Sequence, residues 1–197
     1  MESRGGKWWL RDGDGSASGP FDRVVVAVPA PQAVPLLQEV APSFARAAAR
    51  AEMVPCHAIM MAFSRRLELP FDGLECSDGP FSWIARDSSK PGRPEGETWV
   101  AHVRPEVAAA HLEEGPDART SRWTRAFRAA FDVEEPLLHA GSHRWRYARA
   151  KVPGDAAPTF LHDDLGIGVC GDWLTGARVE AAWRSGRALA EAMSRPS

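Results

Sequence analysis

The stretch Leu165-Gly-Ile-Gly-Val-Cys-Gly-Asp-Trp-Leu-Thr-Gly-Ala-Arg-Val-Glu180 decides the fold. Its apolar, glycine-rich beginning predicts a buried strand, followed by a tight turn and a helix from about Arg178 to Met193. A strand that ends on a helix N-terminus presents free backbone N–H groups, and the helix dipole favours negative charge there. Gly171 lets a ligand approach the backbone because it has no Cβ. Asp172 can accept hydrogen bonds from ligand hydroxyl groups.

The same stretch spells G-x-G-x-x-G through Gly166, Gly168 and Gly171. That pattern binds dinucleotides only inside a βαβ unit, with an acidic residue about 20 positions further on. The sequence stops at Ser197, before a second strand can follow the helix. We therefore reject a dinucleotide-binding turn of this type here. A purely structural alternative is that the glycines only pack a strand against a helix.

Composition limits the class of protein. The 197 residues are 44% hydrophobic, enough for a packed core in one large or two small domains. A net charge of −2 argues against a nucleic-acid partner. The start lacks the apolar region of a signal peptide, and no apolar run reaches the roughly 18 residues of a membrane span. We therefore expect a cytoplasmic location and no membrane contact, while the oligomeric state stays open.

The cysteines are Cys56, Cys76 and Cys170, an odd number without C-x-x-C spacing. This favours free thiols in a reducing compartment and excludes a disulfide scaffold or a zinc site.

The rest of the chain alternates strand and helix patterns. The β-branched run Val24–Val28 is typical of a strand buried on both faces, and Pro29-Ala-Pro31 ends it. Further strands are expected at 55–63, 67–69, 74–76, 81–85, 98–103, 141–148 and 159–162. Helices are expected at 32–40, 43–53, 105–112 and 120–131, the last with an apolar face of Trp123, Phe127 and Phe131. The fold class is α/β, with mixed strands and helices.

Several phrases resemble one protein family. Gly171-Asp172-Trp173, Arg178-Val179-Glu180 and Ser185-Gly186 resemble the C-terminal flavin-binding segment of FAD-dependent amine-oxidase-like proteins. The resemblance is closest to the bacterial renalase-like branch. Four other segments resemble that branch in the same order: 21–33, the strands around 83–93, 99–102, and His143-Arg-Trp-Arg-Tyr147.

The resemblance implies FAD as the cofactor. The implied cofactor-binding residues are Gly171, Asp172, Trp173, Arg178, Val179 and Glu180. In that family the Gly-Asp pair contacts the ribityl-pyrophosphate part of FAD. The helix that follows points its N-terminus at the flavin ring, where the helix dipole would stabilise negative charge.

The resemblance also implies a domain layout. Residues 1–53 would be a partial FAD-binding domain, 54–140 a substrate domain with an inserted mixed or antiparallel sheet, and 141–197 the return to the FAD-binding domain. Val24–Val28 and Ile167–Cys170 should then be neighbours in one sheet. Such proteins begin with a glycine-rich Rossmann turn, and this chain starts downstream of it. We therefore expect a C-terminal portion, produced by a mis-called start codon, a truncated gene or a split protein.

The implied activity is oxidation of reduced nicotinamide dinucleotide isomers, or of amine-type substrates, with O2 as acceptor. His102, Asp87, Ser88 and Trp83 would form the catalytic side, converging on one concavity that faces Gly171–Arg178. At Asp87 the family usually carries Asn, and an ionised carboxylate can only accept hydrogen bonds. A half-buried strand histidine and a solvated loop are the structural alternatives for these positions.

Other chemistries receive less support. His139 and His143 stand at i, i+4, but Gly141 and Ser142 between them oppose a helical metal site, so no metal is expected. Cys56 and His57 are neighbours on a strand and point to opposite faces, which opposes a thiol nucleophile. A non-catalytic binding fragment without cofactor and a flavin-free hydrolase-like enzyme remain as alternative functions.

Overall fold

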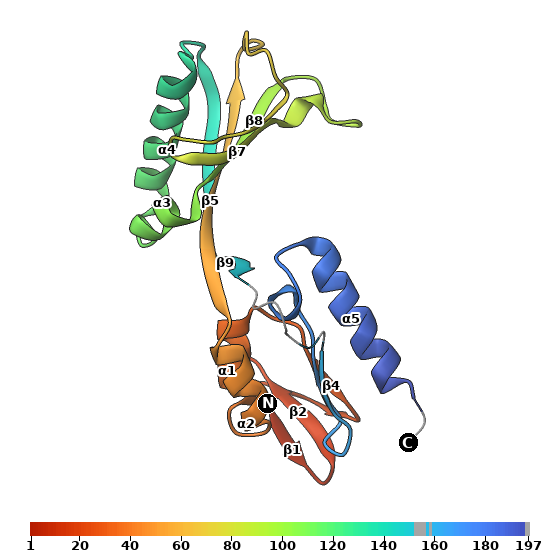
Figure 1. The fold of residues 1–197 in the computed structure, drawn as a ribbon. Helices are drawn as coiled ribbons and strands as arrows, with labels where there is room; N and C mark the ends of the chain where they lie inside the picture. Colours follow the sequence, from red (N-terminus) through yellow and green to blue (C-terminus); the bar gives the residue numbers. More distant parts are fainter. Residues whose placement is uncertain (152–156, 158, 196–197) are drawn as a thin grey trace. The chain divides into compact units, whose positions relative to one another are not determined.

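The computed structural model describes residues 1–151, 157 and 159–195, which form two compact units (Figure 1). Unit 1 combines Met1–Met53 with the segment from Arg149 onward, and unit 2 is Val54–Ala148. The expected return to the first unit at residue 141 falls inside one unbroken strand, β9 (Leu137–Lys151). The change of unit comes at Arg149, and residues 141–148 of β9 belong to unit 2.

Unit 1 contains two small sheets. The strands β1 (Glu2–Arg4), β2 (Lys7–Arg11) and β3 (Ala17–Phe21) form an antiparallel meander. The second sheet has the order β10-β11-β4, from β10 (Phe160–His162), β11 (Ile167–Val169) and β4 (Val24–Val26). The helices are α1 (Ala30–Leu37), α2 (Pro42–Ala49) and α5 (Val179–Met193), with a 3-10 turn η2 at Asp172–Leu174.

The predicted pairing of distant segments is confirmed. β4 and β11 are parallel neighbours, with Ile167 opposite Val24 and Val169 opposite Val26. The ladder ends two residues earlier than predicted from the Val24–Val28 run. The last bond runs from the N–H of Cys170 to the carbonyl of Val26 over 3.2 Å.

Successive residues of β11 point to opposite faces of the sheet, and the two faces pack against different helices. Ile167 and Val169 are fully buried in a core shared with alanines of α1 and α2 and with Trp8. Gly168 points the other way, and a Cβ there would lie 2.7 Å from Leu189 of α5. Gly168 therefore allows α5 to pack directly on the strand, which confirms that this glycine serves helix packing and not a dinucleotide turn.

Unit 2 is one five-stranded sheet covered on one face by helices (Figure 1). Its strands are β5 (Glu52–Phe63), β6 (Gly73–Glu75), β7 (Phe81–Arg86), β8 (Glu97–Val103) and β9, in the order β6-β7-β8-β5-β9. The covering helices are α3 (Pro105–Ala110) and α4 (Pro116–Phe131), and η1 (Asp87–Ser89) follows β7.

The apolar face predicted for α4 is confirmed. Trp123 and Phe127 are buried against Phe63, Phe81 and other inward residues of the sheet. The Phe131 ring lies 5.2 Å from that of Phe127. Burial of each such ring contributes roughly 1.5–3 kcal/mol. The opposite face of the sheet therefore stays available for a ligand.

The strand predicted at 67–69 is wrong. Leu67 is buried in a loop, and its N–H donates to the carboxylate of Glu97 over 3.0 Å instead of joining a ladder. The carbonyls of Leu67 and Leu69 accept hydrogen bonds from the Arg86 guanidinium. The backbone groups of this loop are therefore hydrogen-bonded by the side chains of Glu97 and Arg86 and not by a neighbouring strand.

One histidine on the covered face of the sheet lacks a second partner. His57 is fully buried, and its Nδ1 accepts a hydrogen bond from Trp123 Nε1 over 3.0 Å. Its Nε2 has no partner among the described residues. Burial is the main cause that lowers the His57 pKa to about 4. The nearby charges are those of Arg119, Glu114, His111 and Arg144.

We expect this histidine to make unit 2 sensitive to acid. In the unfolded chain His57 titrates near its ordinary pKa of about 6.5. Between about pH 6.5 and pH 4 the unfolded chain therefore binds a proton at His57 more readily than the folded unit does. The stability that neutral His57 contributes is fully present above about pH 6.5 and is lost as the pH falls toward 4. The loss reaches about 3 kcal/mol at pH 4, from 1.36 kcal/mol per pKa unit. Urea unfolding at neutral pH and near pH 4 would measure it, with His57→Gln beside the exposed control His143→Gln. Equal pH dependence of wild type and His57→Gln would contradict the prediction.

Candidate functional site

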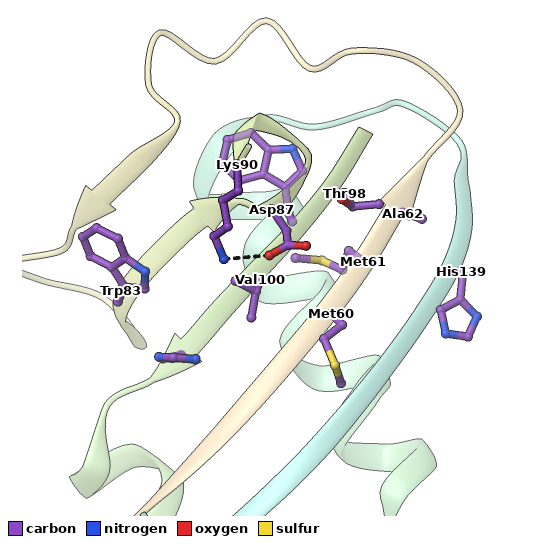
Figure 2. Close-up of a pocket in the computed structure, with 11 residues that line it drawn as sticks. Met60, Met61, Ala62, Trp83, Asp87, Lys90, Thr98, Val100 and His139 are labelled. Atoms are coloured by element: carbon purple, nitrogen blue, oxygen red, sulfur yellow. Dashed lines mark hydrogen bonds and ion pairs between the residues drawn. The ribbon is translucent and has the colours of Figure 1, made fainter. Parts of the chain in front are cut away.

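A hollow of about 510 Å³ opens on the uncovered face of the unit 2 sheet (Figure 2). Strands β5, β7, β8 and β9 and the turn η1 supply its walls. Its lining residues are Met60, Met61, Ala62, Trp83, Asp87, Lys90, Thr98, Trp99, Val100, His102 and His139. Of the four residues predicted for the catalytic side, it brings together Trp83, Asp87 and His102.

The floor of the hollow is apolar and partly aromatic. Trp83 and His102 stand opposite each other on β7 and β8, and Met60 stands opposite Val100 on β5 and β8. Met60 and Trp83 keep 43% and 42% of their surface exposed, which is high for large apolar residues on a sheet. Exposed apolar surface inside a hollow is typical of a ligand site.

A charged group forms the rim of the hollow. The carboxylate of Asp87 accepts a hydrogen bond from Lys90 over 2.6 Å and forms an ion pair with Arg93 at 3.2 Å. The hydrogen bond from Lys90 is the main cause that lowers the Asp87 pKa. Asp87 is therefore ionised at neutral pH and is already paired with two cations.

Ser88 lies outside the lining of the hollow. Its hydroxyl accepts a hydrogen bond from the N–H of Thr98 over 3.3 Å. The neighbouring Ser89 hydroxyl donates to the carbonyl of Arg86 over 2.9 Å. Both serines therefore tie η1 to the ends of β7 and β8.

His102 is one of two histidines that line the hollow, beside His139. Burial, followed by the positive charge of Lys90, lowers the His102 pKa. The imidazole is therefore neutral at pH 7, with one nitrogen that donates and one that accepts. A neutral histidine of this kind can orient a polar ligand group through either nitrogen.

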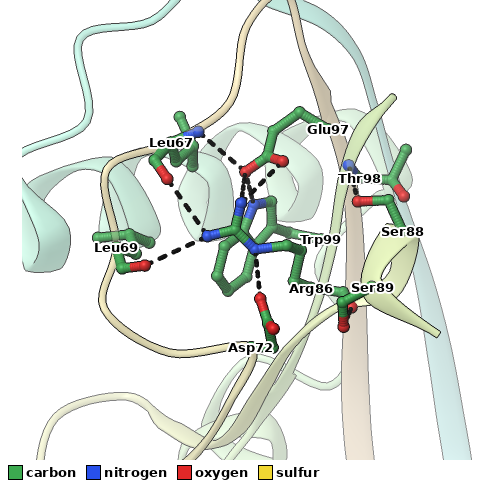
Figure 3. Close-up of polar contacts among 9 residues, drawn as sticks. All are labelled: Leu67, Leu69, Asp72, Arg86, Ser88, Ser89, Glu97, Thr98 and Trp99. Atoms are coloured by element: carbon green, nitrogen blue, oxygen red, sulfur yellow. Dashed lines mark hydrogen bonds and ion pairs between the residues drawn. The ribbon is translucent and has the colours of Figure 1, made fainter. Parts of the chain in front are cut away.

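A buried ion pair behind the hollow was not predicted from the sequence (Figure 3). The Arg86 guanidinium donates to both oxygens of Glu97, over 2.8 and 2.9 Å, and both residues are almost fully buried. Trp99 Nε1 also donates to Glu97 over 2.8 Å, and the Arg86 guanidinium lies 4.7 Å from the Trp99 ring. Arg86 Nε lies 2.8 Å from Asp72, an ion pair without hydrogen-bond geometry. Only the β7–β8 register brings these residues together, and no local pattern in the sequence reveals it.

The predicted cofactor segment lies in unit 1, between β11 and α5. The N–H of Gly171 donates to the hydroxyl of Ser185 over 3.0 Å. A Cβ on Gly171 would lie 2.7 Å from Trp173 Nε1, which itself donates to the carbonyl of Val28 over 3.2 Å. The indole of Trp173 therefore gives a sufficient reason for glycine at 171. The Trp173 side chain is buried in the core of unit 1, and it supports the backbone of this segment from the core side.

Asp172 offers a half-buried hydrogen-bond acceptor. Burial raises its pKa, and the N–H groups of Trp173 and of Asp172 itself partly offset this effect. No ion pair of Asp172 is present among the described residues. Its carboxylate can therefore accept hydrogen bonds from ligand hydroxyl groups.

The N-terminus of α5 opens onto a second hollow, of about 460 Å³. Arg178 precedes the helix and makes no side-chain cap, and Val179 is 89% exposed. Glu180 pairs with Arg184 one turn further on, at 2.7 Å. An uncapped helix N-terminus beside an open hollow, with the Asp172 acceptor in the segment before it, fits a cofactor that carries hydroxyl groups and negative charge.

Comparison with known proteins identifies the family. The family model for flavin containing amine oxidoreductases matches residues 2–194, almost the whole chain. The chain belongs to this family. FAD is the cofactor that membership of this flavin-containing amine oxidoreductase family implies.

Solved structures with the same fold are distant in sequence. A protein of Exiguobacterium sp. 255-15 named as a protoporphyrinogen oxidase matches 98% of this chain with a TM-score of 0.67 at 15% identity. Cyclohexylamine oxidase from Brevibacterium oxydans IH-35A matches 88% with a TM-score of 0.61 at 14% identity. The matches cover 45% and 42% of those chains, so this chain spans less than half of their length.

The described residues contain neither a metal-binding cluster nor a membrane-spanning helix. No three His, Cys, Asp or Glu side chains gather there closely enough to hold a metal ion. No helix in the described part of the chain is long and apolar enough to cross a membrane.

Proposed function

We propose that this family member is an FAD-dependent oxidoreductase acting on a reduced nicotinamide dinucleotide, in the manner of renalase-like proteins. The observation that carries the proposal is the hollow of unit 2, because it gathers Trp83, Asp87 and His102 beside an apolar floor. FAD, when bound, would supply the hydride acceptor for such a reaction. Residues 1–53 and the segment from Arg149 onward would then hold the cofactor, and 54–148 would hold the substrate.

The side chains that line the hollow, together with the neighbouring Ser88, have different roles in this proposal. The flat substrate ring packs on Trp83, Met60 and Val100, whose surfaces are apolar. Neutral His102 hydrogen-bonds the carboxamide of the ring and orients it. Ser88 fixes the position of η1 through its hydrogen bond with the N–H of Thr98. Asp87 fixes the position of Lys90 at the rim through their ion pair.

The charges at the rim favour a dinucleotide over an amine. Asp87 is the only carboxylate in the lining, and it is already paired with Lys90 and Arg93. The three groups together carry a net charge of about +1, which attracts phosphate and repels an ammonium group.

In unit 1, Asp172 would accept hydrogen bonds from the ribityl hydroxyls of FAD, and the N-terminus of α5 would face its flavin end. Gly171 and Trp173 would fix the backbone of this segment, and Arg178 to Glu180 would form the helix start. The Asp172 carboxylate and the first N–H groups of α5 are the contacts that this chain itself offers to the cofactor.

We expect His102→Ala to slow the reduction of FAD by a reduced nicotinamide dinucleotide about tenfold. The reason is the loss of one orienting hydrogen bond, worth roughly 1–1.5 kcal/mol. Anaerobic loss of flavin absorbance would measure the rate in a version of the chain preceded by a glycine-rich dinucleotide-binding segment, and FAD binding to that version should not change. His162→Ala, an exposed histidine of unit 1, is the control. Unchanged reduction in His102→Ala would remove His102 from the substrate site.

A further inference from the structure

The two rows of side chains on β9 have different surroundings. Residues 142, 144 and 146 face α3, α4 and the turn between them. Ser142 Oγ lies 3.0 Å from Arg119 Nε and 2.8 Å from Thr120, and both arginines of this row bind Glu113. The other row contains His139, which lines the hollow, followed by Gly141, His143 and Trp145. Since side chains alternate along a strand, this second row continues the floor of the hollow along β9.

Trp145 follows His143 in this second row, ahead of Tyr147, and its aromatic ring is exposed. It is 55% exposed, and its ring centroid lies 4.4 Å from that of His143. Gly141 separates this pair from His139 without filling the space, because a Cβ there would meet only His139, at 3.5 Å. Gly141 therefore adds no side chain between His139 and the aromatic pair.

We propose that His143 and Trp145 form a second ring-binding subsite, which holds the far ring of a two-ring dinucleotide whose first ring occupies the hollow. This inference rests on the proposed function and extends its site. Four residues of strand place His143 about 13 Å from His139, and six place Trp145 about 20 Å away. A ligand with two flat ring systems joined by an extended linker can reach both places.

A dinucleotide fits this row better than a nucleic acid. Exposed aromatic residues on a sheet also stack the bases of single strands, but such sites line a positively charged groove. On β9 the cations Arg144 and Arg146 lie in the opposite row and are paired with Glu113. Arg149 and Lys151 come later in the row of Trp145, at the far end of the strand, and Lys151 is paired with Glu52. With a net charge of −2, the chain offers no electrostatic attraction to a long polyanion.

Binding of one-ring and two-ring ligands tests the proposal. The probes are NADH and reduced nicotinamide mononucleotide, titrated calorimetrically into the 197-residue protein. Trp145→Ala should weaken NADH binding about tenfold or more, because one base–aromatic stack is lost. It should leave the mononucleotide unchanged, and Trp145→Phe should retain most of the NADH affinity. Leu138→Ala, an exposed residue of the same strand next to His139, is the matched control.

The outcomes separate this inference from the proposed function. If wild type binds both probes and Trp145→Ala binds NADH as tightly as wild type, the second subsite is overturned and the hollow stands. Equal losses for both probes would show that Trp145 supports the hollow itself, which also overturns the subsite. If wild type binds neither probe, the proposed substrate fails, and the subsite fails with it.

Discussion

Replacing Glu97 by alanine is expected to lower the free energy of unfolding of unit 2 by about 3–5 kcal/mol. The substitution removes the buried anionic partner of the Arg86 guanidinium and leaves only the exposed Asp72, while 99% of the Arg86 side chain is inaccessible to solvent. The same change removes the acceptor for Trp99 Nε1 and for the N–H of Leu67. A buried charge without a buried counter-charge and two orphaned donors are each strongly unfavourable.

Urea unfolding followed by tryptophan fluorescence would measure this effect. Asp72→Ala is the matched control, because Asp72 also pairs with Arg86 but its side chain is 57% exposed. Exposed pairs contribute about 0–1 kcal/mol, so the control should change little. The double variant Arg86→Met with Glu97→Leu should recover much of the loss, since it removes both charges. Equal stability of Glu97→Ala and Asp72→Ala would show that burial does not make this pair important.

The Arg86–Glu97 ion pair supports the hollow as well as the stability of unit 2. Arg86 is the last residue of β7, and η1 with Asp87 follows directly. Trp99, which contacts both Arg86 and Glu97, lines the hollow. The pair therefore fixes one wall of the hollow from behind.

Local pattern was sufficient for the elements that carry strong periodicity. The valine run at β4 and the glycine-rich β11 both indicated buried strands, and their parallel pairing is confirmed. The 3.6-residue period of Trp123, Phe127 and Phe131 likewise indicated the buried face of α4. These signals are visible in sequence because each depends on neighbours within one element.

Features that depend on long-range contacts could not be predicted in the same way. Leu67–Leu69 has a strand-like composition, yet its backbone is satisfied by the side chains of Arg86 and Glu97. The glycine at 171 was interpreted as room for a ligand, whereas its neighbour Trp173 already requires it. His57 lacks a second partner only because α4 covers it. In each case the deciding contact comes from another residue whose position the sequence pattern does not give.

The 197-residue chain alone is expected to bind FAD weakly, roughly three or more orders of magnitude below a flavoprotein that contains the whole cofactor site. In the proposed function, the described residues would contact one end of the cofactor, through Asp172 and the N-terminus of α5. They contain no further glycine-rich strand–turn–helix that could hold the pyrophosphate and the adenosine end. The charge-assisted hydrogen bonds of such a turn are worth about 1.5–3 kcal/mol each, and about 1.4 kcal/mol corresponds to a tenfold change in affinity.

The exposed surfaces of unit 1 agree with weak binding by the chain alone. β4 lies at the edge of the β10-β11-β4 sheet, and Val25 on it is 48% exposed. Parallel strands are normally buried on both faces, so a further strand and helix would fit at this edge.

Quenching of flavin fluorescence would give the FAD affinity of the chain and of a version preceded by a glycine-rich dinucleotide-binding segment. The extended version should bind far more tightly, and Asp172→Ala should weaken it about tenfold, with Asp163→Ala as an exposed control. Tight, stoichiometric FAD binding by the short chain would show that the cofactor site lies elsewhere among its residues.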